Sequence, residues 1–120
     1  MYEIAIEDSF DAAHCLPNYP GNCSRVHGHT YKVRVCFRTS SLDSLGMAFD
    51  FRKAKDILRA TLNYMDHNYI NELPEFSDQS PTAENIARFV HDRVRAVEDS
   101  LYCVTVWETP SSSVTYYPEG

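Results

Sequence analysis

The sequence lacks the features of a membrane or secreted protein. No stretch approaches the roughly 18 consecutive apolar residues that a membrane-spanning helix needs. The opening segment, MYEIAIED, has no basic start and no apolar run, so we expect no signal peptide. There is also no internal repeat and no low-complexity segment. These absences predict a cytoplasmic protein without a membrane partner.

The sequence also lacks an excess of positive charge. It holds 11 Lys and Arg residues against 17 Asp and Glu residues, for a net charge of −6. A nucleic-acid partner requires a basic face, so we expect none. A phosphorylated small molecule is not excluded, because a few local cations suffice to bind it. The candidate cations are Arg25, Lys32, Arg34 and Lys53, although each one alone is better explained as a solvated surface charge.

Cysteine is scarce, and the four cysteines are scattered. No CxxC pair occurs among Cys15, Cys23, Cys36 and Cys103. The cytoplasm keeps thiols reduced, so free thiols are the simplest expectation. Three of the four are expected to be inert, and only Cys23 is a candidate for chemistry, for the reason given below.

The length and composition predict one modest folded domain over residues 1–120. The hydrophobic fraction of 43% is typical of globular chains and not of disordered ones. A chain of 120 residues lies within the usual range of a single domain. Its core is small, so we expect a pocket for a sizeable ligand to be completed by neighbouring subunits.

The hydrophobic pattern predicts the element order ββααββ. Alternation of apolar and polar residues predicts strands over 2–14, 27–38, 101–109 and 114–117. Helical spacing predicts helices over 51–64 and 82–98, with Asp50 as the N-cap of the first. For the second helix, Pro81 at the first helical position and Thr82 as N-cap are both acceptable starts. The expected fold class is α+β, an antiparallel sheet with both helices on one face.

The histidines give the strongest chemical signal. His27 and His29 stand two apart in a predicted strand, so their side chains share a face. That face continues through the apolar residues Tyr31 and Val33 and should be sheltered. His14 has the parity of the apolar residues in the preceding strand. A strand–loop–strand meander would therefore bring His14 beside the HGH pair.

Three imidazoles without a clear fourth ligand are typical of a zinc ion with an open coordination position. That arrangement is catalytic, whereas structural zinc sites are closed by four protein ligands. Imidazole also suits copper, nickel and iron, so the pattern does not name the metal. The alternative is that HGH forms a turn whose two histidines are solvated or packed.

Further candidates for proton transfer lie near the ends of predicted elements. Asp66 and His67 close the first helix, where a carboxylate beside an imidazole can form a proton relay. The alternative is that His67 is a favourable cation at a helix C-terminus. Cys23 lies four residues before His27, and a thiol near zinc can act as a base, although a lone cysteine is more often an inert small residue.

Glu108 is a candidate ligand-binding residue. It shares the parity of Val104 and Val106, and an acid on an apolar strand face is costly unless it is paired. Such a carboxylate often meets a cation or two donors on a flat ligand. The alternative is that the strand ends at Trp107 and that Glu108 faces water. His91, in the middle of the second helix, is expected to be exposed.

Six segments resemble a known family. FDAAH, CSRVHGH, DFRKAK, MDHNYIN, SPTAEN and VWETP occur in this order between Phe10 and Pro110. They resemble the 6-pyruvoyltetrahydropterin synthase family, and most of all its 6-carboxytetrahydropterin synthase branch in the queuosine (7-deazaguanine) pathway. The branch depends on the four-residue step from Cys23 to the first His of HGH. Pyruvoyl-forming enzymes have a longer gap, and another branch has a Glu in place of this Cys.

The resemblance implies roles for individual residues. It implies that zinc is bound by His14, His27 and His29. It implies that Cys23 is the general base and that Asp66 and His67 form a proton-transfer pair. It further implies that Glu108 anchors the pterin ring through a ring N–H and the exocyclic amine, and that the Thr82 segment lines the pterin site.

The resemblance also implies an assembly and a reaction. The implied fold is the tunnelling fold, an oligomeric barrel, in a homohexamer of two trimers with active sites between subunits. The implied enzyme is a zinc-dependent carbon–carbon lyase that converts 7,8-dihydroneopterin triphosphate to 6-carboxy-5,6,7,8-tetrahydropterin, acetaldehyde and triphosphate. The alternative is a synthase that eliminates triphosphate and gives 6-pyruvoyltetrahydropterin without cleaving the chain. A third reading, a non-catalytic protein with structural zinc, would require a fourth protein ligand.

Overall fold

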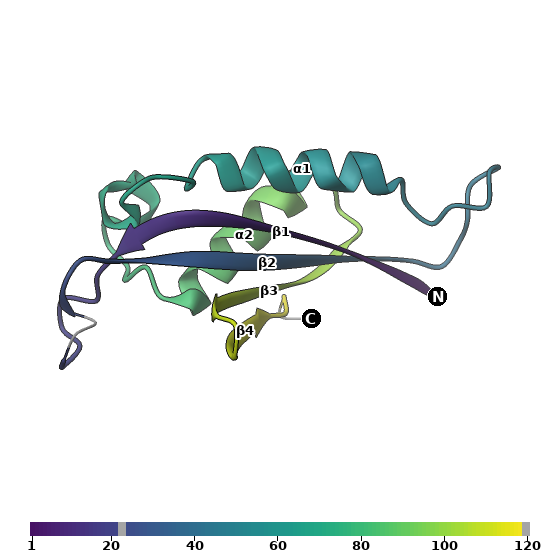
Figure 1. Cartoon of the computed structure of the whole chain (residues 1–120). Coiled ribbons are helices and arrows are strands. Elements are labelled where there is room, and N and C mark those ends of the chain that lie inside the picture. Colours follow the sequence, from purple (N-terminus) through teal and green to yellow (C-terminus); the bar gives the residue numbers. More distant parts are fainter. Residues whose placement is uncertain (22–23, 119–120) are drawn as a thin grey trace.

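The structure, a computed structural model, describes residues 1–21 and 24–118 (Figure 1). One antiparallel sheet has its strands in the order β1-β2-β3-β4. The strands are β1 (Tyr2–His14), β2 (His27–Thr39), β3 (Leu101–Thr109) and β4 (Ser112–Tyr116). The helices are α1 (Phe51–Asn63) and α2 (Ala83–Val97), with two short 3-10 turns, η2 (Ile70–Glu72) and η3 (Pro74–Phe76), between them.

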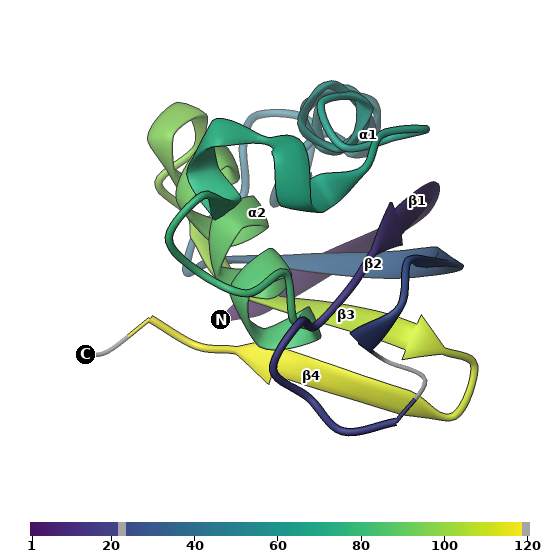
Figure 2. The ribbon, with the colours of Figure 1, turned by 90° about the vertical axis from the view of Figure 1, so that its left-hand side faces the viewer.

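Both helices cover the same face of the sheet, as the α+β prediction requires (Figures 1 and 2). The end of β1, the start of β2 and the segment that joins α1 to α2 lie at one end of the molecule (Figure 1). This end holds most of the candidate site residues. None of the helices in the described ranges is long and apolar enough to cross a bilayer.

Capping side chains explain where the helices begin. The Asp50 carboxylate accepts a hydrogen bond from the Arg52 amide at 2.9 Å, as predicted for the N-cap of α1. At α2, the Thr82 hydroxyl accepts from the Asn85 amide at 3.1 Å, and Pro81 lies outside the helix. The choice between the two possible starts of this helix is therefore settled in favour of Thr82 as N-cap.

The core lies between the sheet and the helices. On β2 the helix-facing residues Tyr31, Val33, Val35 and Phe37 are almost fully buried, as the alternation predicted. Leu58 and Val90 contribute the matching buried stripes from the helices. Two large apolar residues of the helices are not part of this core: Phe51 is 58% exposed and Val97 is 66% exposed. Each stands at a helix end, beyond the packed part of its stripe.

His91 corrects a second expectation. It was expected to face solvent, yet its residue is only 6% exposed. Strand β4 packs against α2 there, and the His91 ring meets the ring of Tyr116 edge-on with centroids 4.9 Å apart. The helical periodicity of α2 was correct, but the extent of the sheet beneath the helix was not visible in the sequence.

Candidate functional site

Three histidines converge where β1 ends and β2 begins. The register places His14 opposite His27 and Ala12 opposite His29. The ring centroids lie 4.6 Å apart for His14 and His27, 5.1 Å for His14 and His29, and 4.9 Å for His27 and His29. One nitrogen from each ring lies within 4.8 Å of the other two. The prediction that the meander brings His14 beside the HGH pair is confirmed.

Backbone carbonyls orient two of these rings. Nδ1 of His14 lies 2.8 Å from the carbonyl oxygen of Pro81, and Nδ1 of His27 lies 2.7 Å from that of Arg25. A carbonyl oxygen only accepts, so each Nδ1 carries the proton and donates it. Each Nε2 is then left with a free lone pair, which is the usual second-shell arrangement of a metal-binding histidine.

The chemistry of these nitrogens fits a metal ion. Nε2 of His14 and Nε2 of His29 are buried and have no hydrogen-bond partner among the described residues. Buried polar atoms without partners are costly and rare, so such a pair requires an explanation. Burial also lowers the pKa of His14 and of His29 and outweighs the opposing effect of Glu108. The neutral imidazoles that result are the form that binds metals.

Glu108 stands beside this group. Its Oε1 lies 3.3 Å from Nε2 of His29, a distance within ion-pair range. The same nitrogen nevertheless has no hydrogen bond, because the contact is close enough for an ion pair but is not aligned as a hydrogen bond. The nitrogen therefore remains available to a metal, and the carboxylate is a neighbour of the group, not a member of it.

A local irregularity of the sheet explains where Glu108 points. Trp107 pairs with Ser113 and Thr109 pairs with Ser112, so Glu108 is an extra residue without a β4 partner. Such bulges redirect a side chain and are common beside active sites. The strand continues through Thr109, so the alternative in which it ends at Trp107 is wrong. Glu108 is half-buried and not fully solvated.

A hollow of about 570 Å³ adjoins the histidines. It lies where β2 pairs with β3 only from Lys32 onward, so that within the described ranges residues 27–31 of β2 have no β3 pairing partner. Its volume lies in the range of small-molecule sites. The residues that line it come from three strands and the following turn: Ser9, Gly28, His29, Thr30, Lys32, Trp107, Glu108, Thr109 and Pro110.

Asp66 and His67 form a second group on the outer edge of β1. One Asp66 carboxylate oxygen lies 3.0 Å from Nδ1 of His67 and accepts from the Asp11 amide at 3.0 Å. The Asp11 carbonyl in turn accepts from the His67 amide at 2.6 Å. The Asp11 amide, followed by His67 and Arg59, lowers the pKa of Asp66. The carboxylate is therefore held ionised beside the imidazole, as a proton relay requires.

The backbone of His67 is unusual. Its φ angle is +60°, in the left-handed region that non-glycine residues seldom occupy. The hydrogen bonds to Asp11 hold this conformation in place, and the side chain is 78% exposed. Sparsely populated backbone conformations cluster at functional sites, because a functional requirement can outweigh their cost.

The two groups are not joined within one chain. Across the described ranges, no hydrogen bond or ion pair connects Asp66 or His67 with the three histidines. Thr82 follows Pro81, which contacts His14, but it lines a smaller hollow of about 220 Å³ that does not include Glu108. Cys23 lies outside the described residues. The structure therefore assembles only part of the predicted site.

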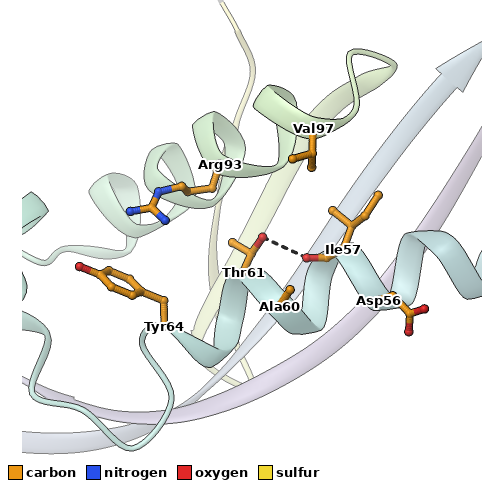
Figure 3. A pocket seen from close by; sticks show the side chains of 7 residues that line it. All are labelled: Asp56, Ile57, Ala60, Thr61, Tyr64, Arg93 and Val97. Carbon is orange, nitrogen blue, oxygen red and sulfur yellow. Dashed lines mark hydrogen bonds between the residues drawn. The ribbon is translucent and has the colours of Figure 1, made fainter.

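Another hollow, of about 470 Å³, lies between α1 and α2 (Figure 3). Three of its polar side chains are already engaged: Thr61 donates to the Ile57 carbonyl at 3.0 Å, and both Arg93 and Tyr64 donate to Glu75. Asp56 is its remaining polar side chain, and no histidine or cysteine lines it. It therefore offers no imidazole, unlike the hollow beside Glu108.

Sequence reasoning missed the residues that support the site. The Pro81 carbonyl that orients His14 and the Asp11 backbone that holds Asp66 have no side-chain signature. Arg59 was also missed; its guanidinium bridges α1 to Ser9 and Asp8 of β1 and lies 3.7 Å from Asp66. The spacing of Thr82 and Asn85, which is that of a helix capping pair, was the one available signal.

The fold and the site together define an α+β protein with an open three-histidine centre beside a ligand-sized hollow. The sequence profile described as 6-pyruvoyl tetrahydropterin synthase matches residues 3–119. The chain belongs to this family. That assignment agrees with the six segments that the sequence shares with it.

Individual relatives refine the comparison. The chain is 36% identical to the 6-carboxy-5,6,7,8-tetrahydropterin synthase of Bacillus subtilis strain 168, over 98% of this chain and 86% of that protein. It is also 36% identical to the Synechocystis protein of the same name, over 98% of this chain and 94% of that protein. The solved structure of Caenorhabditis elegans 6-pyruvoyl tetrahydropterin synthase superposes with a TM-score of 0.87 at 30% identity, over 99% of this chain and 98% of that one.

Proposed function

We propose that this protein is a 6-carboxytetrahydropterin synthase, a zinc-dependent carbon–carbon lyase of queuosine biosynthesis. Its substrate is 7,8-dihydroneopterin triphosphate. With one water, the substrate gives 6-carboxy-5,6,7,8-tetrahydropterin, acetaldehyde and triphosphate. The observation that carries the proposal is the pair of Nε2 atoms, on His14 and His29, that have no partner within residues 1–21 and 24–118 and lie beside Glu108 and an open hollow.

Zinc is the metal that best fits the centre. His14, His27 and His29 would hold it, because three imidazoles with no fourth protein ligand among the described residues leave one position for substrate. When bound, zinc supplies Lewis-acid polarisation of the neighbouring hydroxyls on the substrate side chain. The structural-zinc alternative requires a closed set of four protein ligands, and the described residues supply three.

Glu108 anchors the pterin ring in this proposal. An ionised carboxylate offers two acceptor oxygens, and a pterin offers a ring N–H and an exocyclic amine along one edge. The bulge directs Glu108 into the hollow of about 570 Å³, beside His29. The ring would then lie along the open edge of β2, with its side chain near the histidines. Thr82 contributes to the wall of the pterin site from the start of α2.

Cys23 removes the proton that starts cleavage of the side chain, and Asp66 with His67 relays it. The family resemblance supports these roles. The Asp66–His67 pair lies on the β1 edge, away from the histidines of its own chain, so a second subunit would supply it. The proposed assembly is a homohexamer of two trimers, in which neighbouring sheets join into a barrel and residues 1–120 act as one domain in the cytoplasm.

Product analysis tests the proposed function. The purified protein is loaded with zinc and incubated with 7,8-dihydroneopterin triphosphate, and the products are identified by mass spectrometry. The expected product has the mass of 6-carboxytetrahydropterin, and a metal-stripped sample should not form it. A pyruvoyl product would instead favour the second candidate, a 6-pyruvoyltetrahydropterin synthase. That candidate is supported by the similarity to the C. elegans structure, and its site would use largely the same residues.

A further inference from the structure

We infer that Asn85 is a positioning residue for the metal centre, acting through the Ser80–Pro81–Thr82 segment on His14. The inference rests on the proposed metal site, and it assigns to this side chain a task beyond the start of α2. Three groups are linked: the buried His14 imidazole donates to the Pro81 carbonyl, and the Asn85 side chain holds the segment that carries this carbonyl.

His14 is the most deeply buried of the three histidines. It is 0% exposed, and its Nδ1 donates to the Pro81 carbonyl at 2.8 Å. This contact fixes both the tautomer and the rotation of the ring, so Nε2 faces the other two imidazoles. If the carbonyl turned away, the proton could move to Nε2 and the ring could rotate. In either case one metal ligand would be lost.

Asn85 restrains the segment on both sides of Pro81. Its side-chain Nδ2 donates to the Ser80 carbonyl at 2.8 Å, and its backbone amide donates to the Thr82 hydroxyl at 3.1 Å. The Thr82 carbonyl is fixed as well, because it accepts from the Ile86 amide at 2.9 Å. The proline ring restricts φ between these anchors. The direction of the Pro81 carbonyl is therefore set by Asn85 and the first turn of α2.

The residue type matters at this position. A capping pair usually has Glu or Gln three residues after the cap, and that side chain reaches back to the N-cap amide. The amide of Asn85 instead donates to a carbonyl further upstream, at Ser80. A carboxylate has no proton to donate there. The fold needs a short side chain at position 85 that carries a donor, and not merely a good helix former.

The test compares two matched amide-to-acid variants, Asn85→Asp and Gln79→Glu. Asp is favourable in the first turn of a helix, so Asn85→Asp keeps the helix start but replaces the donor to Ser80 with an anionic acceptor. Gln79 lies in the same segment and donates to the Glu75 carbonyl at 2.8 Å, so Gln79→Glu removes an equivalent bond that does not reach Pro81. Both variants are made in the full chain, metal-stripped and then titrated.

Two measurements are made on each protein. Long-range ¹H–¹⁵N spectra of the metal-free protein report the tautomer of His14, and competition with a chelator gives the zinc affinity. We expect a single Nδ1–H tautomer in the parent and in Gln79→Glu. In Asn85→Asp we expect a mixture of tautomers and zinc binding weakened about 10-fold, at the lower end of second-shell effects. The thermal unfolding of metal-free Asn85→Asp should match that of Gln79→Glu.

The outcomes separate this inference from the proposed function. Spectra and zinc affinity of Asn85→Asp that match the parent would overturn the inference about Asn85. Equal weakening of zinc binding in both variants would also overturn it, because it would indicate general loosening of the segment. A parent that binds no zinc would contradict the proposed metal centre. In that case the His14 tautomer would still decide whether Asn85 positions the ring.

Discussion

Nε2 of His29 lies 3.3 Å from the carboxylate of Glu108, which joins the three-histidine group to the hollow that would hold a flat ligand. The two residues come from β2 and β3, at the level where these strands stop pairing. One is a candidate metal ligand and the other a candidate ring anchor. In the proposed function their proximity would place the reacting side chain of the substrate beside its bound ring, as bond cleavage next to a heterocycle requires.

Glu108→Gln should weaken substrate recognition without loss of metal. The substitution keeps the shape of the side chain but replaces one acceptor oxygen with a donor, so one of two charge-assisted hydrogen bonds to the ring is lost. Such bonds contribute about 1.5–3 kcal/mol, which predicts a fall in kcat/KM of roughly 10- to 150-fold. Steady-state kinetics and zinc content measure the two quantities. Unchanged kcat/KM, with the exposed control Glu72→Gln as reference, would remove Glu108 from the site.

The metal-free protein should lose stability as the pH falls from 7 towards 5. Burial lowers the pKa of His14 and His29 in the folded state, whereas the unfolded chain takes up protons near the usual histidine pKa of about 6.5. The unfolded state then binds more protons, so the free energy of unfolding decreases with decreasing pH. Urea denaturation with a chelator present measures the slope. His14→Gln should have a shallower slope, and an equal slope would contradict the role of burial.

Asp66→Asn should remove a further contribution to stability that is also lost in acid, but at lower pH than that of the histidines. The pKa of Asp66 is lowered chiefly by the Asp11 amide, so the ionised carboxylate contributes stability that is present at neutral pH. That contribution is lost as the pH falls through the folded pKa, below the usual aspartate value of about 3.9. The variant should therefore be less stable than the parent at pH 7 and converge with it in acid. Asp56→Asn, on the exposed face of α1, serves as the control, and its free energy of unfolding should equal that of the parent at both pH values.

Tyr31→Phe should not destabilise the protein. The Tyr31 hydroxyl is buried and has no hydrogen-bond partner among the described residues, while the ring stacks on Phe10 with centroids 4.9 Å apart. Removing the hydroxyl keeps the packing and removes an unpaired polar group. The free energy of unfolding should stay the same or rise by about 1 kcal/mol. Tyr64→Phe is the contrast, because the Tyr64 hydroxyl donates to Glu75 and its loss should lower stability.

A drop of more than about 1 kcal/mol for Tyr31→Phe would show that this hydroxyl does have a partner in the folded protein. Chemical denaturation at pH 7 measures both tyrosine variants under the same conditions. The contrast between Tyr31→Phe and Tyr64→Phe thus tests whether the buried Tyr31 hydroxyl beside the histidines lacks a hydrogen-bond partner in the folded protein.

Side-chain periodicity made much of the fold and the metal centre predictable. The parity of His14, His27 and His29 followed from strand alternation, and the unusual acid at 108 followed from its place on an apolar face. These signals are local, because the type of a side chain and its position in the strand alternation can both be read from neighbouring residues. The start of α1 was predictable for the same reason, since Asp50 caps its own helix, whereas the sequence left two starts open for α2 and the structure selects Thr82.

Features that depend on distant backbone were not predictable. The Pro81 carbonyl reaches His14 across 67 positions, and carbonyls look the same in every residue. The burial of His91 depends on how far β4 extends beneath α2. The separation of the Asp66–His67 pair from the three histidines depends on how the whole chain folds, and not on the residues next to either group. In the proposed assembly, contacts between subunits would bring these groups together.

The measurement that tests the central claim most directly is the ratio of acetaldehyde to triphosphate released from 7,8-dihydroneopterin triphosphate by the zinc-loaded protein. Carbon–carbon cleavage predicts one acetaldehyde for each triphosphate, with both falling together when zinc is removed. Triphosphate without acetaldehyde would contradict the lyase and identify the elimination reaction. Release of neither product by zinc-loaded protein would contradict a catalytic role for the three-histidine centre.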